Sequence, residues 1–395
     1  MTDAVRRTPL TAEHEALGAT LTPFGGWLMP LRYAGELAEH RAVRTAAGLF
    51  DLSHMGEISV TGPDAAAFLD HALVGAISRV RLMGARYSMI VAEDGGVLDD
   101  LIVYHNARGE YLVVANAANR DVVVSALAER ASGFDVSVED GSDRVALIGV
   151  QGPRALEVLE AVPGLSATAE LSLGGTLREL RYYACTGVDF AGSAVLVART
   201  GYTGEDGFEL FVDADVAVEL WRAVLAAGEP FGLVPAGLSA RDSLRLEAGM
   251  PLYGHELTRD VTPFDAGLGR VVRLDKADVD GEPLDFVGRE ALARIAAELD
   301  EPSSRRVLVG LAGNGRRPLR ADYEVLAPDG GEPTAVGRVT SGGLSPTLGH
   351  PIALAYVERA ASAPGTPLLV DVRGRHEAVR VVDLPFYTRP TPSQP

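Results

Sequence analysis

Two adjacent carboxylates interrupt an apolar run, VLDDLIVY, at residues 97–104. Because alternate residues of a strand face opposite sides, Asp99 and Asp100 would point to opposite faces, each among hydrocarbon neighbours. An unpaired buried carboxylate lowers the stability of the fold by several kcal/mol or takes a raised pKa. Proteins tolerate such a group mostly where it binds or reacts. Two interpretations are equally favoured by the pattern: at least one of the carboxylates is functional, or the aspartates end the strand and bond to neighbouring amides.

A second candidate is ARTGYTGEDGFELF, residues 198–211, where glycines recur at every third position from Gly201 to Gly207. A phosphate-binding loop would end in Gly-Lys-Ser/Thr and open a helix, and a dinucleotide fingerprint would also open a helix. Here FELFVD alternates like a strand, so we expect a lengthened hairpin loop. Glu209 projects opposite to its apolar neighbours and would be either solvated or part of a site.

Three further polar residues are candidates, and two of them have two interpretations each. Asn116 ends the apolar run YLVVAN and would be a turn residue or an amide that recognises a heterocycle. Tyr87 opens YSMIVA and would be half-buried packing or a stacking platform. Arg389, near the C-terminus, would ordinarily be a surface charge.

The segment SARDSLRLEAG predicts a helix with Ser239 as its N-cap and Gly249 as its stop. Arg241 and Arg245 would share a face four residues apart. Since like charges repel at that spacing, the pair needs anionic neighbours.

The 395 residues exceed one ordinary core and indicate about two to three domains. Acidic residues number 54 against 36 basic ones, Lys276 is the only lysine, and the formal net charge is −18. Such a surface argues against nucleic acid as a partner, and an anionic ligand would need local arginines.

The N-terminal stretch lacks the apolar core of a secretion signal, and no later run approaches the roughly 18 apolar residues of a membrane helix. We therefore expect a cytoplasmic protein without a membrane partner. The single cysteine, Cys185, excludes an intrachain disulfide and is expected to be buried. No His-x-x-x-His pair occurs, so we expect no zinc site or other metal.

An internal repeat organises the elements that position these residues. The strand GEISVTG leads through a Gly-Pro corner into the helix PDAAAFLDHAL, and VALIGVQG leads in the same way into PRALEVLEAV. Strands follow in both copies, RELRYYACTG, SAVLVART and FELFVD in the second, and then a helix. After a polar connecting stretch, LDKADVDGEPLDFVGREALAR, six short strands predict a small barrel or sandwich.

Motifs spread in order over almost the whole chain resemble those of the glycine cleavage system T-protein, the aminomethyltransferase family. They include LFDLSHMGEISVTGP, GGVLDDLIVY, VVANAANRD, GYTGEDGFEL, ARDSLRLEAGMPLYGHEL, VTSGGLSPTLG and the closing LPFY. The resemblance implies an α+β protein shaped like a three-lobed clover-leaf, with two intertwined ferredoxin-like α+β lobes and a small C-terminal β-barrel. The lobes would comprise residues 1–52 with 142–272, residues 53–141, and residues 285–390.

The resemblance also implies a reaction. An aminomethyltransferase of this family moves the one-carbon unit from the aminomethyl-lipoyl arm of H-protein to tetrahydrofolate, which is the acceptor. Ammonia, methylene-tetrahydrofolate and the reduced lipoyl carrier are the products. The expected partners are thus the lipoylated H-protein and a small-molecule folate, with no metal.

Matched position by position, the family's catalytic aspartate falls on Asp100, whose carboxylate would accept a proton and stabilise iminium-like charge. The folate contacts fall on Glu209, suited to pterin N–H groups, and on Arg241, suited to the carboxylates of the tail. Further contacts around the pterin fall on Tyr87 and Asn116. At the C-terminus the match falls on Tyr387 or Arg389, and charge favours the arginine.

Other members of the superfamily are rival interpretations. A sarcosine or dimethylglycine oxidising enzyme is expected to carry a dinucleotide-binding segment ahead of the first motif, and none is found. A folate-binding protein of iron–sulfur maturation would carry a Lys-Gly-Cys-Tyr motif where this chain has RTGYTGEDG. A stand-alone tetrahydrofolate-dependent demethylase and a non-catalytic folate-binding protein stay open. For carrier docking we expect an arginine patch that includes Arg305, Arg306 or Arg320.

Overall fold

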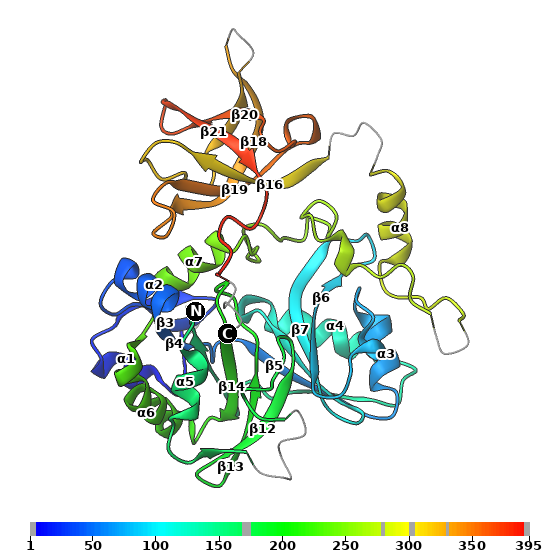
Figure 1. Ribbon diagram of the computed structural model, residues 1–395. Coiled ribbons are helices and arrows are strands. Elements are labelled where there is room, and N and C mark those ends of the chain that lie inside the picture. The colour runs from blue at the N-terminus through cyan, green and yellow to red at the C-terminus, as the bar shows by residue number, and fades with distance from the viewer. Residues whose placement is uncertain (1–4, 168–174, 278–280, 300–304, 329–331, 391–395) are drawn as a thin grey trace.

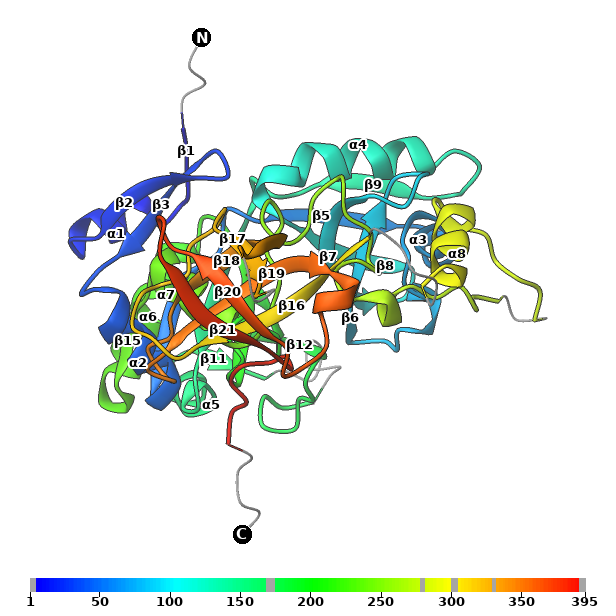
Figure 2. The same ribbon diagram turned by 90° about the horizontal axis from the view of Figure 1, so that it is seen from above.

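The computed structural model describes residues 5–167, 175–277, 281–299, 305–328 and 332–390. Two α+β lobes lie side by side, and a β-barrel lies above them, next to α7 (Figure 1). Seen from above, the barrel strands lie over the middle of the molecule, between the N-terminal sheet and helix α4 (Figure 2). No helix in the described part of the chain is both long enough and apolar enough to cross a membrane. The cytoplasmic location stays a prediction.

One α+β lobe is built on a five-stranded sheet in the order β6-β7-β8-β5-β9. Helices pack their apolar residues on one face, where Phe68 and Val123 meet Ile58 and Val103. The order β9-β5-β8-β7 follows the expected ferredoxin-like layout, with β6 added at the edge. The elements are β5 (Gly56–Thr61), α3 (Ala65–Ala72), β6 (Gly84–Val91), β7 (Val97–Ala107), β8 (Glu110–Ala115), α4 (Arg120–Arg130) and β9 (Ser137–Asp140).

The other α+β lobe is built on a seven-stranded sheet in the order β11-β12-β13-β14-β10-β4-β15. Its strand β4 (Ala47–Asp51) precedes the whole five-stranded lobe in sequence and pairs with both β10 and β15. The two lobes are therefore intertwined. The remaining elements are β10 (Val145–Gln151), α5 (Ala155–Glu160), β11 (Leu165–Ser166), β12 (Cys185–Phe190), β13 (Ser193–Ala198), β14 (Gly207–Asp213), α6 (Ala217–Gly228) and β15 (Leu233–Pro235).

Two details of this lobe bear on the sequence predictions. The strand expected from residue 178 begins only at Cys185, because residues 177–179 and 182–183 form turns and Ala184 makes only an isolated bridge to Gly84. Cys185 itself is buried, as expected. The glycine-rich stretch is confirmed as a hairpin loop, since it joins β13 to β14, which pair with Ala198 opposite Glu209.

The N-terminal residues and helix α7 complete this side of the molecule. Helix α7 begins at Leu238, so the prediction that Ser239 caps it is wrong: Gly237 occupies the N-cap, in an extended conformation, and its amide donates to Glu39 Oε2 at 2.9 Å. Gly249 follows the helix with φ of +66°, as expected of a stop. The elements are β1 (Arg6–Arg7), α1 (Thr11–Ala16), β2 (Thr20–Phe24), β3 (Trp27–Arg32), α2 (Glu36–Thr45) and α7 (Leu238–Glu247).

All six C-terminal strands are confirmed, and they close into a barrel in the order β16-β19-β18-β17-β20-β21. The stretch expected to be a polar connection ends at Arg294 and overlaps helix α8 (Arg289–Ala297), whose Leu292 and Ile295 are buried. The strands are β16 (Arg306–Gly313), β17 (Glu324–Ala327), β18 (Thr334–Leu344), β19 (Pro351–Glu358), β20 (Pro367–Asp371) and β21 (His376–Val382). The 3₁₀ helices are η1 (Ile77–Arg79), η2 (Ala117–Asn119), η3 (Glu229–Phe231), η4 (Gly269–Val271) and η5 (Arg359–Ala361).

A buried carboxylate at the end of α7 joins the barrel to the seven-stranded lobe. Glu247 Oε2 accepts hydrogen bonds from His40 Nε2 at 3.1 Å, Arg44 Nη2 at 2.8 Å and Thr347 Oγ1 at 2.8 Å. Burial would raise the pKa of Glu247, but its hydrogen bonds, chiefly from His40 and Ser345, hold the pKa at about 2. Since Thr347 and Ser345 belong to the barrel, this network fixes the barrel on α2 and α7. The exact limits of the three lobes stay a prediction.

Candidate functional site

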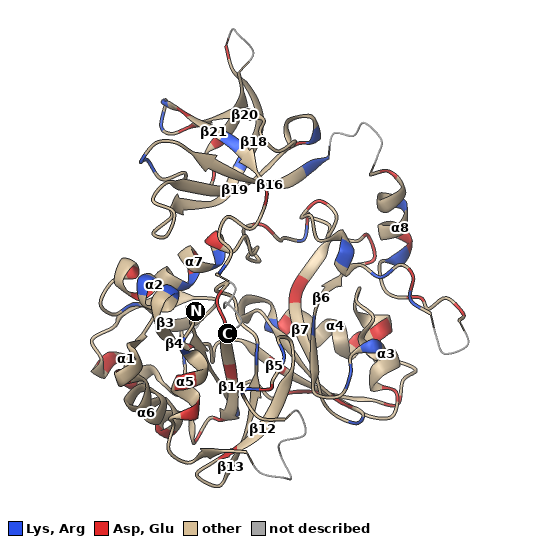
Figure 3. Cartoon of the chain, viewed as in Figure 1, with Lys and Arg blue, Asp and Glu red and all other residues tan. Residues whose placement is uncertain are grey.

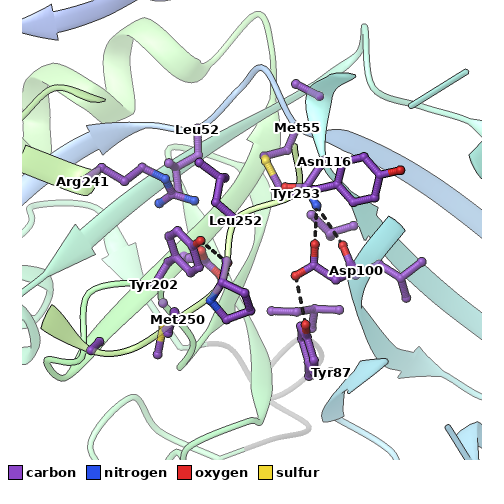
Figure 4. A pocket seen from close by; sticks show the side chains of 18 of the residues that line it. Leu52, Met55, Tyr87, Asp100, Asn116, Tyr202, Arg241, Met250, Leu252 and Tyr253 are labelled. Carbon is purple, nitrogen blue, oxygen red and sulfur yellow. Dashed lines mark hydrogen bonds between the residues drawn. The ribbon is translucent and has the colours of Figure 1, made fainter. Parts of the chain in front are cut away.

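A cavity of about 590 Å³ opens between the lobes. Its walls combine residues of both α+β lobes, the segment that follows α7, and Leu384 and Pro385 after the barrel. Volume and lining are typical of small-molecule sites, which are mostly apolar with a few convergent polar groups. Figure 4 shows Asp100, Asn116 and Tyr87 on one side of this cavity and Arg241 and Tyr202 on the other.

Strand β7 places Asp100 at the cavity with two hydrogen-bond donors. Tyr87 OH donates to Oδ2 at 3.0 Å, and Asn116 Nδ2 donates to Oδ1 at 2.8 Å. Burial raises the pKa of Asp100 to about 6, although both donors favour the ionised form. Burial and the nearby Asp100 also raise the pKa of Tyr87, so the phenol remains a donor. Asp100 is therefore a carboxylate of unusually high basicity that still ionises below neutral pH.

Asp99 points to the opposite face of β7, as the strand period predicts, and is fully buried. Its Oδ1 accepts from Asn116 Nδ2 at 2.9 Å and from Asn119 Nδ2 at 2.6 Å, and its Oδ2 accepts from the Asn116 amide at 2.9 Å. Burial and the charge of Asp100 raise the pKa of Asp99 to about 7. Asn116 thus lies between the two carboxylates, at the turn after β8, and connects them through one amide group.

Glu209 on β14 also lines the cavity and is only 8% exposed. Its Oε2 accepts hydrogen bonds from Thr200 Oγ1 and, at 3.3 Å, from Tyr104 OH. No hydrogen bond of the described residues reaches its other carboxylate oxygen, Oε1. One oxygen of Glu209 is thus held by the protein, and the other is free of hydrogen-bond donors from the described residues.

The glycine-rich loop is held against Gln151, a buried residue of β10. Gln151 Nε2 donates to Thr200 O at 3.1 Å, and Thr203 Oγ1 donates to Gln151 Oε1 at 3.0 Å. A Cβ atom at Gly201 would lie 2.0 Å from Gln151 Oε1, which no side chain could occupy without a shift. A larger residue here would have to displace the Gln151 amide that holds the loop, so close packing favours glycine at this position, which the spacing of the glycines alone did not reveal.

Arg241 lines the cavity from α7, across from Asp100 (Figure 4). Its guanidinium carbon lies 4.8 Å from the centroid of the Tyr202 ring, a cation–π geometry. Burial lowers the pKa of Arg241, while Tyr202 and Glu209 favour its charged form. Burial and the charge of Arg241 also lower the pKa of His54, another lining residue, to about 4, so His54 is neutral.

The prediction that Arg241 and Arg245 have anionic neighbours is confirmed, among the described residues, by ion pairs at Arg245 but not at Arg241. Arg245 is buried and pairs with Glu256 at 2.9 Å and with Asp242 at 2.7 Å. No ion pair of Arg241 occurs among the described residues, and its guanidinium instead faces Tyr202 and the cavity.

Sequence reasoning missed several lining residues. Tyr202 lies inside the glycine-rich motif, and residues 250–255 lie inside the motif GMPLYGHEL, yet neither motif carries a local sign that its side chains face a cavity. His54 belongs to the motif LFDLSHMG and was missed for the same reason.

The two C-terminal candidates do not line the cavity, although Leu384 and Pro385 do. The ring of Tyr387 packs 4.1 Å from the Arg44 guanidinium, and its amide donates to Glu247 O at 2.8 Å. Arg389 lies 3.5 Å from Asp206, which also pairs with Arg199. Of the seven residues carried over from the family, five therefore meet at one cavity and these two lie outside its lining.

Arginines are scattered over the three lobes rather than gathered on one face (Figure 3). Of the arginines expected to dock a carrier, Arg305 pairs with Asp265 at 3.0 Å, and Arg306 and Arg320 are exposed on the barrel. None of the three lines the cavity, whereas Arg270 is exposed and does line it. Within the described ranges, no three His, Cys, Asp or Glu side chains are grouped so as to hold a metal ion.

Comparison with known proteins agrees with this architecture. Residues 10–276 match the family described as the GCVT N-terminal domain, and residues 306–388 match the glycine cleavage T-protein C-terminal barrel domain. The crystal structure of glycine cleavage system aminomethyltransferase T from Bartonella henselae superposes with a TM-score of 0.84 at 36% identity, covering 98% of this chain and 99% of that one.

Curated relatives are similar over nearly their full length. The aminomethyltransferase of Streptomyces avermitilis is 58% identical over 388 residues, which cover 98% of this chain and 99% of the relative. That of Moorella thermoacetica is 48% identical over 386 residues, covering 98% and 99%. These matches favour an aminomethyltransferase over the rival interpretations. The chain therefore belongs to the glycine cleavage T-protein family and is an aminomethyltransferase of the glycine cleavage system.

Proposed function

We propose that the cavity binds tetrahydrofolate with its pterin between Asp100 and Glu209, and that the chain transfers to it the one-carbon unit carried by the lipoyl arm of H-protein. The observation that carries this proposal is Asp100, an unusually basic carboxylate with two donors, facing a cavity of about 590 Å³. Tetrahydrofolate is the acceptor that this enzyme family uses, and acceptor groups on both sides of an apolar cavity suit a flat heterocycle rich in N–H groups.

The chemistry sets what the residues must do. Two bonds of the transferred carbon break, one to the amine and one to the lipoyl sulfur, and two bonds form, to the two folate nitrogens. Each folate nitrogen loses one proton as it forms its bond. One proton leaves with the ammonia, and the other goes to the sulfur. The site therefore needs a group that accepts a proton near the folate nitrogens and returns it.

Asp100 suits that role. Its pKa of about 6 lies close enough to neutral pH for efficient proton transfer, yet the group is ionised at the start of the reaction. Each carboxylate oxygen receives one hydrogen bond from a side chain, so lone pairs are left for the substrate. The negative charge also stabilises iminium-like positive charge on the carbon during transfer. Tyr87 and Asn116 hold the carboxylate in place.

We assign recognition of the pterin to Glu209, whose Oε1 would accept N–H groups of the ring. Arg241 would bind the carboxylates of the folate tail by charge-assisted hydrogen bonds. The C-terminal contact stays open between Tyr387 and Arg389, since both lie outside the cavity lining.

For the carrier, we propose docking at the mouth of the cavity beside Arg270, which is exposed and lines that mouth. Because the chain has a net charge of −18, any acidic group of the carrier would need such a local arginine to bind. The Arg270→Gln variant should weaken association with H-protein, and wild-type association should weaken as salt rises. Association that is insensitive to both would remove Arg270 from the docking surface.

The central experiment supplies aminomethylated H-protein and tetrahydrofolate, each alone and together, and measures ammonia and methylene-tetrahydrofolate. We expect the Asp100→Asn variant to bind tetrahydrofolate within about threefold of wild type and to turn over about 10²–10⁴-fold more slowly. The exposed Asp215→Asn is the matched control. Unchanged turnover in Asp100→Asn would exclude this carboxylate from the mechanism.

A further inference from the structure

One side of the cavity is an irregular stretch of chain, residues 250–256, here called the wall segment. Its residues from Met250 to His255 all line the cavity. The segment belongs to no helix or named strand. It contains a short turn, in which Gly254 N donates to Leu257 O at 2.7 Å. Its start is anchored to α7 by the bond from Met250 N to Arg245 O at 2.9 Å, and beyond that its position depends on side chains that bond to its backbone.

A buried ion pair supplies those bonds. Arg245 on α7 and Glu256 at the end of the wall segment are 1% and 0% exposed at their side chains, with Nη1 and Oε2 2.9 Å apart. The same Glu256 Oε2 accepts the Leu252 amide at 3.0 Å, and Arg245 Nη1 also donates to Met250 O at 3.2 Å. The pair thus fixes the start, the middle and the end of the wall segment.

The barrel takes part in the same network. Ser341 Oγ on β18 accepts Arg245 Nη2 at 2.7 Å, and Tyr356 OH on β19 donates to Glu256 O at 2.8 Å. His255 Nδ1 lies 3.2 Å from Thr340 O, also on β18. The wall segment is therefore supported from outside the cavity by two neighbouring barrel strands.

On its other side the wall segment touches the parts of the site assigned to folate and catalysis. Tyr253 OH donates to Val97 O at 3.2 Å, at the start of the strand that carries Asp100. Tyr202 OH donates to Pro251 O, and the Tyr202 ring packs on Arg241. A shift of the wall segment would consequently move groups on both sides of the cavity.

We propose that Arg245 and Glu256 are positioning residues for the acceptor substrate, and that the barrel acts on the cavity through Ser341. This inference rests on the proposed binding of tetrahydrofolate in the cavity. Neither residue lines the cavity, so their effect reaches the substrate only through the wall segment. The barrel in this interpretation is part of the binding site and not only a covering lobe.

Stability and positioning can be separated experimentally. Removing one partner of a buried ion pair leaves an uncompensated charge, whereas replacing both by apolar residues of similar volume is often neutral for stability. The double variant Arg245→Met with Glu256→Leu should therefore unfold cooperatively near the wild-type temperature. It lacks the bonds to Met250 O and the Leu252 amide, so the dissociation constant for tetrahydrofolate should rise about tenfold and kcat should fall by about the same factor.

Hydrogen–deuterium exchange without any ligand gives a readout that does not depend on folate. Amides of residues 252–257 should exchange faster in the double variant than in wild type, while those of β7 and β14 stay protected. The control is Arg154→Met with Glu157→Leu, which removes an exposed pair on α5. A folded double variant with wild-type exchange and wild-type affinity would overturn the inference.

A milder variant keeps the proposal testable if the double variant does not fold. Ser341→Ala retains the ion pair and removes the barrel hydroxyl that accepts Arg245 Nη2 and lies 3.5 Å from His255 Nδ1. Its control is Ser362→Ala, whose hydroxyl bonds Arg359 O at 2.8 Å. We expect Ser341→Ala to raise the dissociation constant about threefold and to speed exchange in the wall segment. No change in either quantity refutes the role of the barrel. Absence of tetrahydrofolate binding to wild type would instead refute the proposed function and leave the exchange result standing.

Discussion

The hydrogen bond from Tyr87 OH to Asp100 Oδ2, 3.0 Å long, makes a quantitative prediction about pH dependence. After burial, which raises the pKa of Asp100 to about 6, this bond is the largest influence, and it lowers the pKa. A hydrogen bond to a charged group contributes about 1.5–3 kcal/mol, and one pKa unit corresponds to about 1.4 kcal/mol. Water that enters the cavity of the variant would partly replace the phenol, so we take the lower end, a rise of about one pKa unit in Tyr87→Phe.

The consequence is a loss of activity confined to low pH. Asp100 must be ionised to accept a proton, so activity falls as the pH drops through its pKa. With a pKa of about 7 in place of about 6, the ionised fraction at about pH 6 falls from about one half to about one tenth, and kcat/KM falls about fivefold. At about pH 8.5 the two proteins should differ little.

The assay is the initial rate of methylene-tetrahydrofolate formation from about pH 5.5 to about pH 9, with H-protein held constant. Tyr323→Phe, in the barrel and outside the cavity lining, is the matched control. An equal loss of kcat/KM at every pH would refute the reasoning, because it would mean that the phenol contacts the substrate and does not tune the carboxylate.

Three further predictions concern the loop, the barrel contact and the folate tail. In urea titrations, Gly201→Ala should lower the free energy of unfolding by about 1–3 kcal/mol, because its Cβ would overlap Gln151. The control Gly343→Ala, with open space around it, should change the free energy of unfolding by no more than about 0.5 kcal/mol. Glu247 has a pKa of about 2 against an ordinary 4.5, so it contributes about 3 kcal/mol to the free energy of unfolding. This contribution is complete above about pH 5 and is lost as the pH falls toward 2. Between about pH 6 and about pH 3 the free energy of unfolding of wild type should therefore drop by about 2 kcal/mol more than that of Glu247→Gln. Arg241→Gln should raise the dissociation constant for tetrahydrofolate about 10–100-fold by calorimetry with cooperative unfolding retained, and an unchanged constant would remove Arg241 from the binding site.

Local periodicity was enough to predict the strands and the directions of several site residues. The alternation in VLDDLIVY predicted that Asp99 and Asp100 face opposite sides, and the structure places one in the core and the other at the cavity. The alternation after the glycines likewise predicted a hairpin and the direction of Glu209. These features depend on neighbours within a few residues, which a sequence displays directly.

Features that depend on distant residues could not be predicted. The need for glycine at position 201 comes from Gln151, fifty residues earlier in the chain, and the wall segment is fixed by a barrel that begins fifty residues later. Ser239 was a reasonable N-cap by residue type, but Glu39 binds the amide of Gly237 and starts the helix there. The same limit applies to Tyr387 and Arg389, whose places are set by Arg44 and Asp206 on other elements.

The place of β4 has a consequence for how the molecule assembles. This strand, complete by residue 51, pairs with β10 and β15, the latter ending at residue 235. During synthesis on the ribosome, nearly two hundred residues are added after β4 before its neighbour β15 is complete. The strands around Asp100, in contrast, are all synthesised by residue 140. Non-local pairing of this kind is slow, and domains tend to fold as units in order of synthesis. We expect the strand that carries Asp100 to reach its native sheet first. Newly made chains should be most prone to aggregate while the seven-stranded lobe is still incomplete.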